Sequence, residues 1–405
     1  MLKIFNSLGK KFEYFRPVNP DVVNIFTCGP SVYQRAHIGN FRTFLFEDVL
    51  VRYLQYSGYC VRRGMNITDI EDKALRAAHE KHSRLKDLTS RNIRTFISEM
   101  RTLKMEAPDY FPRASQHVAD AVRIIEILLE KGIAYQWQDN IYFDPLKYPD
   151  FGKIYGLDMK KWPSKKIRFH LDNYPTTRWN FGDFILWHGC LQGERVFWDS
   201  AVGAGWPAWN VQDPSMIIPY MNESLSIYCV GVDNLICHHD YNAAILESVR
   251  PYPAAKYWLH CHHLTMNGKT MSKSTGNILY TDMLHAQGFT MEEIRFFLIY
   301  GHYRSRMNYS KRQMIKSVNR LRELRNRILL IRKKAKGKPG DDAGSAIRLR
   351  KIFTQKMDDD LDVAGAFDSI EMILNQIFPE SLAPSEAASI MGTVRSIDRV
   401  LQVLL

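Results

Sequence analysis

Hydrophobic and polar positions in the N-terminal part of the chain follow the order strand, helix, strand. Residues 22–28 (VVNIFTC) form a short β-branched and aromatic run typical of a buried strand, and Gly29 and Pro30 close it with turn residues. From residue 41 onward apolar side chains recur mostly at four-residue steps, which predicts an amphipathic helix. Residues 58–67 repeat the strand pattern. This order predicts parallel strands joined by a helix.

The end of the second predicted strand carries a helix-start signal. Thr68 and Glu71 have the spacing of a capping box, and residues 73–135 are helical in pattern. Thr68 would then satisfy an orphan N–H of the next helix. Because ligands bind where parallel strands end, a role in substrate binding is the alternative for Thr68.

The pattern changes at residue 135 and returns after residue 209. Aromatic and turn residues crowd the stretch 135–209, which predicts an insertion into a nucleotide-binding fold. A strand pattern resumes at 225–230, and a helix is expected at 241–249. Beyond a Gly/Pro/Asp linker at 337–344 the pattern is again helical. The predicted class is α/β, a split Rossmann-type domain followed by an all-α region.

Composition limits the function classes. The chain has 405 residues, of which 45% are hydrophobic and 24% charged, as in globular proteins of two or three domains. No apolar run approaches the length that spans a bilayer, and the first residues are too polar for a signal peptide. We therefore expect a cytoplasmic protein with no membrane partner. The six cysteines lack CxxC spacing, which argues against a disulfide framework and a zinc ribbon.

Positive charge is concentrated in one segment. The net charge is +12, and residues 311–338 contain 12 Lys or Arg against the single acid Glu323. Such a density on a predicted helix suits the phosphate backbone of a nucleic acid. A solvated basic helix face is the alternative.

A polar tetrad, residues 37–40 (HIGN), stands where the first long helix is predicted to begin. The free N–H groups and the positive dipole end of a helix favour an anion. Gly39 allows a ligand to approach the backbone, while His37 and Asn40 supply side-chain donors. The tetrad predicts a phosphate site, with a plain surface loop as the alternative.

A second motif, residues 267–277 (NGKTMSKSTGN), has the composition of a loop with lysines between glycines. Lysines on such a loop are suited to neutralising charge on separating phosphates. The HIGN tetrad and this loop, in this order, resemble the two signature motifs of class I aminoacyl-tRNA synthetases.

Along nearly its whole length the chain is more closely similar to the cysteinyl-tRNA synthetase family. The residues that carry the likeness are the CGP turn with HIGN, NITDIEDK (66–73), DFILW (183–187), GAGWPAW (203–209), the run 233–239, MSKSTGN, GHYRS (301–305) and MDDDLD (357–362). The fold that this resemblance implies has the first catalytic half at 1–134, a connective insertion at 135–209, the second catalytic half at 210–300, a stem-contact region at 301–338 and a helical anticodon-side domain at 345–405.

The resemblance also implies an activity and a set of site residues. Enzymes of this family activate an amino acid with ATP and Mg²⁺ to an adenylate and transfer it to tRNA. By the same likeness, the catalytic residues are His37, Asn40 and Lys273, ATP contacts also involve Gly39 and Asp233, and the amino-acid pocket includes Gly29, Thr68, Trp209 and His238.

The family's zinc site is altered in this sequence. Its Cys, Cys, His and Glu ligands correspond to Cys28, Asp213, His238 and Asn242. Zinc accepts a carboxylate, so Cys28, Asp213 and His238 could form a three-ligand site with one open position, whereas Asn is a poor ligand. The identity of the amino acid therefore stays open, and Asp213 could instead pair with a cationic or hydroxyl-bearing side chain. His239 is one of the neighbouring histidines that could help hold a metal.

Two further functions remain open from the sequence. One is a paralogue that joins the activated amino acid to a small amine, as the mycothiol-pathway cysteine ligase does. The other is a non-catalytic RNA-binding relic, which the presence of both His37 and Lys273 disfavours. A tRNA acceptor predicts salt-dependent RNA binding, and a small acceptor predicts none.

Overall fold

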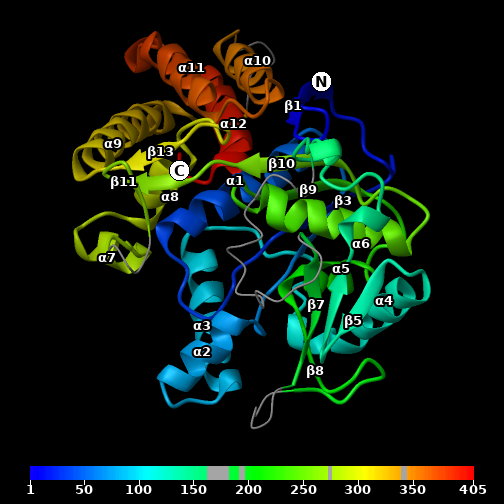
Figure 1. Ribbon diagram of the computed structural model, residues 1–405. Helices are drawn as coiled ribbons and strands as arrows, with labels where there is room; N and C mark the ends of the chain where they lie inside the picture. The colour runs from blue at the N-terminus through cyan, green and yellow to red at the C-terminus, as the bar shows by residue number, and fades with distance from the viewer. Residues whose placement is uncertain (162–181, 191–196, 272–275, 339–343) are drawn as a thin grey trace.

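The computed structural model describes residues 1–161, 182–190, 197–271, 276–338 and 344–405, arranged around a parallel sheet (Figure 1). The strands of this sheet, in spatial order, are β10 (Ala255–Cys261), β9 (Leu225–Gly231), β3 (Val23–Thr27) and β4 (Val61–Met65). All three pairings are parallel, and β3 and β9 are buried along almost their whole lengths. Strands buried on both faces read as continuous apolar runs, which is why the sequence predicted them well.

Two helices start from neighbouring strands at the centre of this sheet. Helix α1 (Ile38–Tyr56) follows β3, and α6 (Asp240–Val249) follows β9, after a π-helical turn η5 (Leu235–His239). From β3 the chain proceeds to β4 on one side, and from β9 to β10 on the other. The strand order therefore reverses between β3 and β9, and ligands of open α/β sheets bind at such a crevice. The α/β class expected from the sequence is confirmed.

The predicted capping box is wrong. Helix α2 (Asp72–Glu80) has Glu71 as its N-cap, with no side-chain cap bond. Thr68 lies before the helix and forms a parallel bridge with Ser31. The Ser31 hydroxyl donates to the Glu71 carboxylate. Glu71 therefore binds a residue distant in the sequence instead of the capping N–H that the local pattern predicted.

The continuous helical stretch predicted over 73–135 is also interrupted. It contains α2, α3 (Leu85–Thr102), a short 3₁₀ turn η1 (Ala114–Gln116) and α4 (Val118–Glu130). Between α3 and η1 the backbone is extended, because Tyr110 and Arg113 pair with Gly64 and Ile67 beside β4. Sheet pairing in the fold therefore overrides the local pattern.

A separate antiparallel sheet occupies the lower right of Figure 1. Its strands in order are β5 (Ala134–Trp137), β6 (Asn140–Phe143), β7 (Phe184–Gly189) and β8 (Gly205–Pro207), with the 3₁₀ turns η2 (Pro145–Lys147) and η3 (Met159–Lys161) between β6 and β7. Helix α5 (Trp209–Ile217) leads back to β9. The Asp240 carboxylate at the start of α6 accepts the N–H groups of Ile154 and Tyr155, which fixes the insertion on the parallel-sheet domain.

Helices make up most of the C-terminal part, at the top and left of Figure 1. They are α7 (Thr281–Ala286), α8 (Met291–Ile299), α9 (Lys311–Lys334), α10 (Gly344–Asp358), α11 (Val363–Asn375), η6 (Pro379–Ser381) and α12 (Pro384–Leu401). Two small sheets accompany them, β1 (Lys3–Asn6) with β2 (Lys11–Tyr14), and β12 (Lys269–Thr270) with β11 (Leu264–Met266) and β13 (Met307–Tyr309). Among the described helices we find none with the length and apolar character needed to cross a membrane.

A buried ion pair joins α1 to the helical part. The Arg295 guanidinium of α8 lies 2.6 Å from the Asp48 carboxylate of α1, and both side chains are fully buried. Arg295 also donates to the carbonyl oxygens of Leu401 and Leu103, each at 2.9 Å. One guanidinium thus connects α1, α8, the end of α3 and the end of α12.

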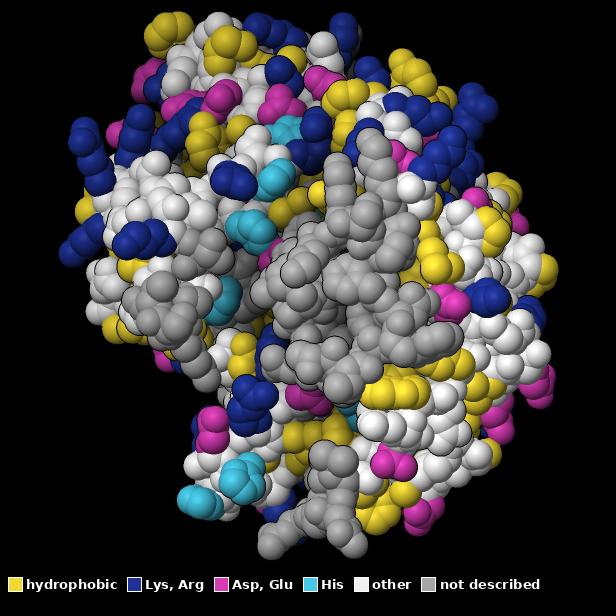
Figure 2. Space-filling model, in the orientation of Figure 1, with side chains coloured by type: hydrophobic (Ala, Val, Ile, Leu, Met, Phe, Trp, Pro, Cys, Tyr) yellow, Lys and Arg dark blue, Asp and Glu magenta, His cyan; other side chains and the backbone are white. Residues whose placement is uncertain are grey.

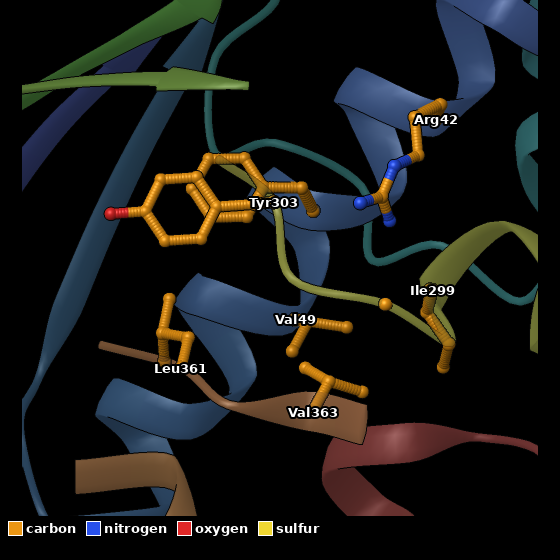
Figure 3. Close-up of a pocket in the computed structure, with 8 residues that line it drawn as sticks. Arg42, Val49, Ile299, Tyr303, Leu361 and Val363 are labelled. Atoms are coloured by element: carbon orange, nitrogen blue, oxygen red, sulfur yellow. The ribbon is translucent and has the colours of Figure 1, made fainter. Parts of the chain in front are cut away.

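A small cavity lies between α1, the end of α8 and the start of α11, lined by Arg42, Val49, Ile299, Tyr303 and Val363 among others (Figure 3). Arg42 is buried and donates to the carbonyls of Leu298 and His302. These contacts place a cation at the C-terminal end of α8, where it complements the helix dipole. The cavity is lined mainly by apolar side chains.

The basic helix α9 uses part of its charge inside the protein. Arg320 pairs with Glu371 of α11, and Arg327 donates to the carbonyl of Leu374 at 2.8 Å. The basic side chains of α9 that are exposed are Lys311, Arg312, Lys316, Arg322, Arg332, Lys333 and Lys334. Figure 2 shows Lys and Arg gathered over α9 at the upper left. A surface for a polyanion therefore remains, although not every cation of the segment contributes to it.

Candidate active site at the carboxyl edge of the parallel sheet

The HIGN tetrad forms the start of α1. His37 is the N-cap, and its Nδ1 accepts the N–H groups of Gly39 and Asn40 at 3.1 and 3.3 Å. In return, Asn40 Oδ1 accepts the N–H of His37 at 3.0 Å. A Cβ on residue 39 would lie 2.9 Å from the His37 ring, so the cap requires Gly39. The tetrad is therefore a reciprocal capping box made by a histidine.

This cap determines which atoms could bind a phosphate. Because Nδ1 of His37 accepts hydrogen bonds, the neutral ring carries its proton on Nε2, which is left to donate. Asn40 uses its oxygen in the cap, so only its NH₂ end can donate to a ligand. Burial lowers the pKa of His37 from 6.5 to about 4, which keeps the ring neutral near pH 7.

The lowered pKa of His37 predicts a pH effect on stability. Between about pH 6.5 and 4 the unfolded chain binds a proton that the folded chain does not, so the free energy of unfolding falls as the pH drops through this interval. His37→Asn keeps a cap acceptor but removes the titration. We expect the variant to lose less stability than the wild type, by up to about 1.4 kcal/mol per pH unit. Urea midpoints across this pH interval check it, and parallel losses in the two proteins would contradict it.

Three buried side chains converge beyond the end of β3. Cys28 Sγ lies 3.2 Å from Asp213 Oδ2 and 3.3 Å from His238 Nε2, and Asp213 Oδ2 lies 2.9 Å from His238 Nε2. Cys28 follows β3, Asp213 lies in α5, and His238 lies in the π-helical turn before α6. The fold thus brings together the three residues that the sequence proposed as ligands.

The Asp213 carboxylate is held from both ends. Its Oδ1 accepts from Asn66 Nδ2 at 2.7 Å, and its Oδ2 accepts from the Tyr228 hydroxyl at 2.8 Å. Burial, and then the negative charge of Asp213, raise the pKa of the Cys28 thiol well above its usual range. In the absence of a cation, Cys28 is therefore a neutral thiol that donates to Asp213.

The three donor atoms fit a divalent metal ion. In tetrahedral zinc sites, donor atoms lie about 3.3–3.6 Å apart. Two of the separations here, 3.2 and 2.9 Å, are shorter, and the third, 3.3 Å, is at the lower end of this range, as expected when protons rather than an ion link the groups. One sulfur, one nitrogen and one carboxylate oxygen are acceptable zinc ligands. However, His238 Nδ1 is buried without a partner among the described residues, whereas metal-bound histidines usually donate from this second nitrogen.

The residues proposed for the amino-acid pocket surround this cluster. The Trp209 ring stacks on His238 at 4.4 Å with an angle of 10°. The N–H of Gly29 donates to Asn66 Oδ1 at 2.6 Å, and Asn66 also contacts the Thr68 hydroxyl at 3.3 Å. A Cβ on residue 29 would lie 1.9 Å from the Asn66 carbonyl oxygen, so only glycine fits. Asn66 thus connects the backbone at Gly29 to the carboxylate of Asp213.

The residues proposed for ATP are only partly described. Asp233, just beyond β9, is about half exposed, and its carboxylate lies 3.4 Å from His263 Nε2. Lys273 lies outside the described residues. The chain that follows it contacts the start of α1, because Leu279 O accepts the N–H of Ile38 at 3.0 Å. His37, Gly39 and Asn40 are thus next to the segment that continues from the lysine loop.

Sequence reasoning missed two side chains of the cluster, Tyr228 and Asn66. Tyr228 lies in the buried strand β9, where nothing in the sequence pattern marks its hydroxyl as part of a polar site. Asn66 was part of the NITD motif at a strand end, a position that could have suggested it. His239, considered as a spare ligand, has Nε2 at 3.9 Å from Cys28 Sγ, while its Nδ1 lies 3.0 Å from His260 Nε2.

Comparisons with known proteins agree with this arrangement. The model of the family described as tRNA synthetases class I (C) catalytic domain matches residues 14–319. The chain is 35% identical to a cysteine–tRNA ligase of Chlamydia muridarum (strain MoPn / Nigg), over all of this chain and 88% of that protein. It is 34% identical to a cysteine–tRNA ligase of Thermococcus onnurineus (strain NA1), over 93% of this chain and 80% of that protein.

A solved structure extends the likeness to the fold. Methionyl-tRNA synthetase of Mycobacterium tuberculosis, in complex with methionyl-adenylate, superposes with a TM-score of 0.66 at 15% identity, over 95% of this chain and 90% of that one. At this identity the match concerns the fold alone. Together with the sequence matches, it leads to one conclusion: this chain belongs to the cysteinyl-tRNA synthetase family of class I aminoacyl-tRNA synthetases.

Proposed function

We propose that this protein activates cysteine with ATP and transfers it to tRNA. The observation that carries the proposal is the convergence of Cys28, Asp213 and His238 beneath Trp209, at the crevice between β3 and β9. It supports the proposal, because these three side chains could hold a metal ion for a thiol side chain in the crevice where α/β folds bind ligands.

Two regions of the protein would take part in the reaction, one binding ATP and the other binding the amino acid. At the start of α1, the Nε2–H of His37, the NH₂ group of Asn40 and the helix dipole would bind ATP phosphates, with Gly39 keeping the approach open. Lys273 would neutralise the leaving pyrophosphate, with Mg²⁺ on the nucleotide, and Asp233 would bind the ribose. These roles rest on the family motifs and on the position of α1.

The second region would bind the amino acid. Trp209 and Thr68 would line the pocket together with Gly29, whose backbone packs too closely against Asn66 for any side chain. Cys28, Asp213 and His238 would hold zinc, which when bound supplies a soft Lewis-acid position that prefers sulfur to oxygen. Without it, size alone would separate cysteine from serine by only about 1–3 kcal/mol.

Charging of tRNA tests the whole proposal. The protein is incubated with ATP, Mg²⁺, radiolabelled cysteine and total tRNA, and acid-precipitable label is measured. We expect label on tRNA that is lost after mild alkaline treatment, because the product is an ester. Cysteine-dependent release of AMP without label on tRNA, but with a small-amine conjugate in its place, would instead identify the amine-ligase alternative.

A control separates binding from catalysis. Lys273→Ala is expected to abolish charging while leaving tRNA binding unchanged, since the exposed cations expected to bind tRNA belong to α9 and the variant keeps all of them. Salt-dependent tRNA binding without any adenylation by the wild type would contradict the proposal and favour the RNA-binding relic.

A further inference from the structure

The residue that departs most from the family's ligand set, Asn242, is connected to the cluster through another side chain. Its Nδ2 lies 2.8 Å from the Tyr228 hydroxyl, and that hydroxyl lies 2.8 Å from Asp213 Oδ2. All three side chains are fully buried. An amide, a phenol and a carboxylate thus form a continuous chain of hydrogen bonds from α6 through β9 to α5.

The chemistry of this chain fixes the orientation of the amide. A tyrosine hydroxyl has one proton, and a buried carboxylate is a stronger acceptor than an amide oxygen. The Tyr228 proton therefore goes to Asp213, and the phenol oxygen can only accept from its other neighbour. Asn242 must present its NH₂ group to Tyr228, and an NH₂ group has no free lone pair for a metal ion.

The bond to Tyr228 sets this orientation, and the other polar contacts of Asn242 do not. The same NH₂ group lies 3.3 Å from His238 Nε2, whereas Oδ1 is buried with no hydrogen-bond partner among the described residues. If the amide were reversed, the phenol oxygen would face the amide oxygen, or the phenol proton would turn to that oxygen and the hydrogen bond to Asp213 would be lost. Asn242, at the fourth ligand position of the family, therefore uses its NH₂ group to bind Tyr228.

We infer that Asn242 is not a metal ligand but a positioning residue, which acts through Tyr228 to hold Asp213 toward Cys28 and His238. This inference rests on the proposed function, since it concerns the same site. It assigns the divalent ion three protein ligands, with Cys28 as the single thiolate. Tyr228 and Asn66 then orient the carboxylate that stands in the place of a second thiolate.

Two properties follow for the metal that the site would take. With one thiolate, the donor set is harder than a two-thiolate site, so cobalt and zinc should both enter, and chelators should remove them readily. The affinity should also depend on Tyr228, although Tyr228 touches no metal, because partners that orient a ligand typically change metal affinity by about 10–100-fold.

The test is a double-mutant cycle on cobalt binding, measured by visible absorption of the metal-free full-length protein titrated with Co²⁺. We expect Tyr228→Phe and Asn242→Ala each to weaken binding by about tenfold and the double variant to be no weaker than the weaker single variant, because both act through one path. The positions of the ligand-field bands and the thiolate-to-cobalt band should be retained in every variant. Tyr53→Phe is the matched control, since Tyr53 donates to Asp358 at 2.9 Å at a different place in the fold.

Two outcomes would overturn the inference. In the first, the fold-losses of cobalt affinity in the two single variants multiply in the double variant. In the second, Asn242→Ala alone displaces the ligand-field bands, as the loss of a direct ligand requires. Should Tyr228→Phe fail to fold by circular dichroism, the spectrum of Asn242→Ala still decides between the two roles.

This test is independent of the proposed function. Cobalt binding with the expected non-additivity, in a protein that does not activate cysteine, would leave the inference standing and remove the proposed function. Cysteine activation together with displaced ligand-field bands in Asn242→Ala would support the proposed function and overturn the inference.

Discussion

Cys28→Ser is expected to lower kcat/KM for cysteine in ATP–pyrophosphate exchange by about a hundredfold or more. Among the described residues, Cys28 Sγ is the only sulfur in the cluster with Asp213 and His238. A serine hydroxyl stays protonated where the thiol would ionise on a metal ion, so the variant loses the one soft ligand. ATP affinity should not change, because the phosphate site at His37 depends on the start of α1.

A matched substitution away from the site serves as the control. Cys60 is exposed, and Cys60→Ser should leave both the exchange rate and the metal content as in the wild type. If Cys28→Ser keeps wild-type exchange with cysteine, then Cys28 has no part in recognising the amino acid, and the pocket must be located elsewhere.

Asp48→Ala is expected to have the largest effect on stability, about 3–5 kcal/mol in the free energy of unfolding. Removing this carboxylate leaves the fully buried Arg295 without its counter-charge at the junction of α1, α8 and α12. Asp282→Ala is the control, because Asp282 pairs with Arg35 at the surface and such pairs contribute about 0–1 kcal/mol. Urea unfolding measures both, and equal effects would contradict the account.

The same pair has a defined pH dependence. Burial alone would raise the pKa of Asp48, but the charges of Arg295 and Arg52 and the N–H of Glu106 outweigh it, so the pKa is lowered. A lowered carboxyl pKa stabilises the fold at pH values above the unfolded pKa, and this contribution is lost as the pH falls through the folded value. Asp48→Ala should therefore show a weaker loss of stability in acid than the wild type.

The sequence predicted the parts of the fold that depend on burial alone. Strands β3 and β9 are buried on both faces, so their apolar runs were sufficient, and the start of α1 followed from the helical periodicity after HIGN. The capping box at Thr68 failed because Ser31, distant in sequence, takes the Glu71 side chain. Pairing of Tyr110 with Gly64 likewise interrupts a stretch whose local pattern was helical.

The sequence predicted the candidate metal ligands of the site, but not the side chains that hold them. The likeness to the family identified Cys28, Asp213 and His238, and the fold brings them together at hydrogen-bonding distances. The connection from Asn242 through Tyr228 to Asp213 could not be predicted. It depends on the Tyr228 hydroxyl within the buried strand β9, and on the turn η5 and the start of α6, which bring His238 and Asn242 next to it.

The measurement that most directly tests the central claim, that a metal on Cys28, Asp213 and His238 selects cysteine, is ATP–pyrophosphate exchange with cysteine and with serine. The protein is assayed as metal-free protein and again after zinc is restored. The account predicts exchange with cysteine that requires zinc, and little exchange with serine in either state. Exchange with serine or another amino acid that is indifferent to zinc would contradict it, and would mean that Asp213 binds the substrate side chain directly.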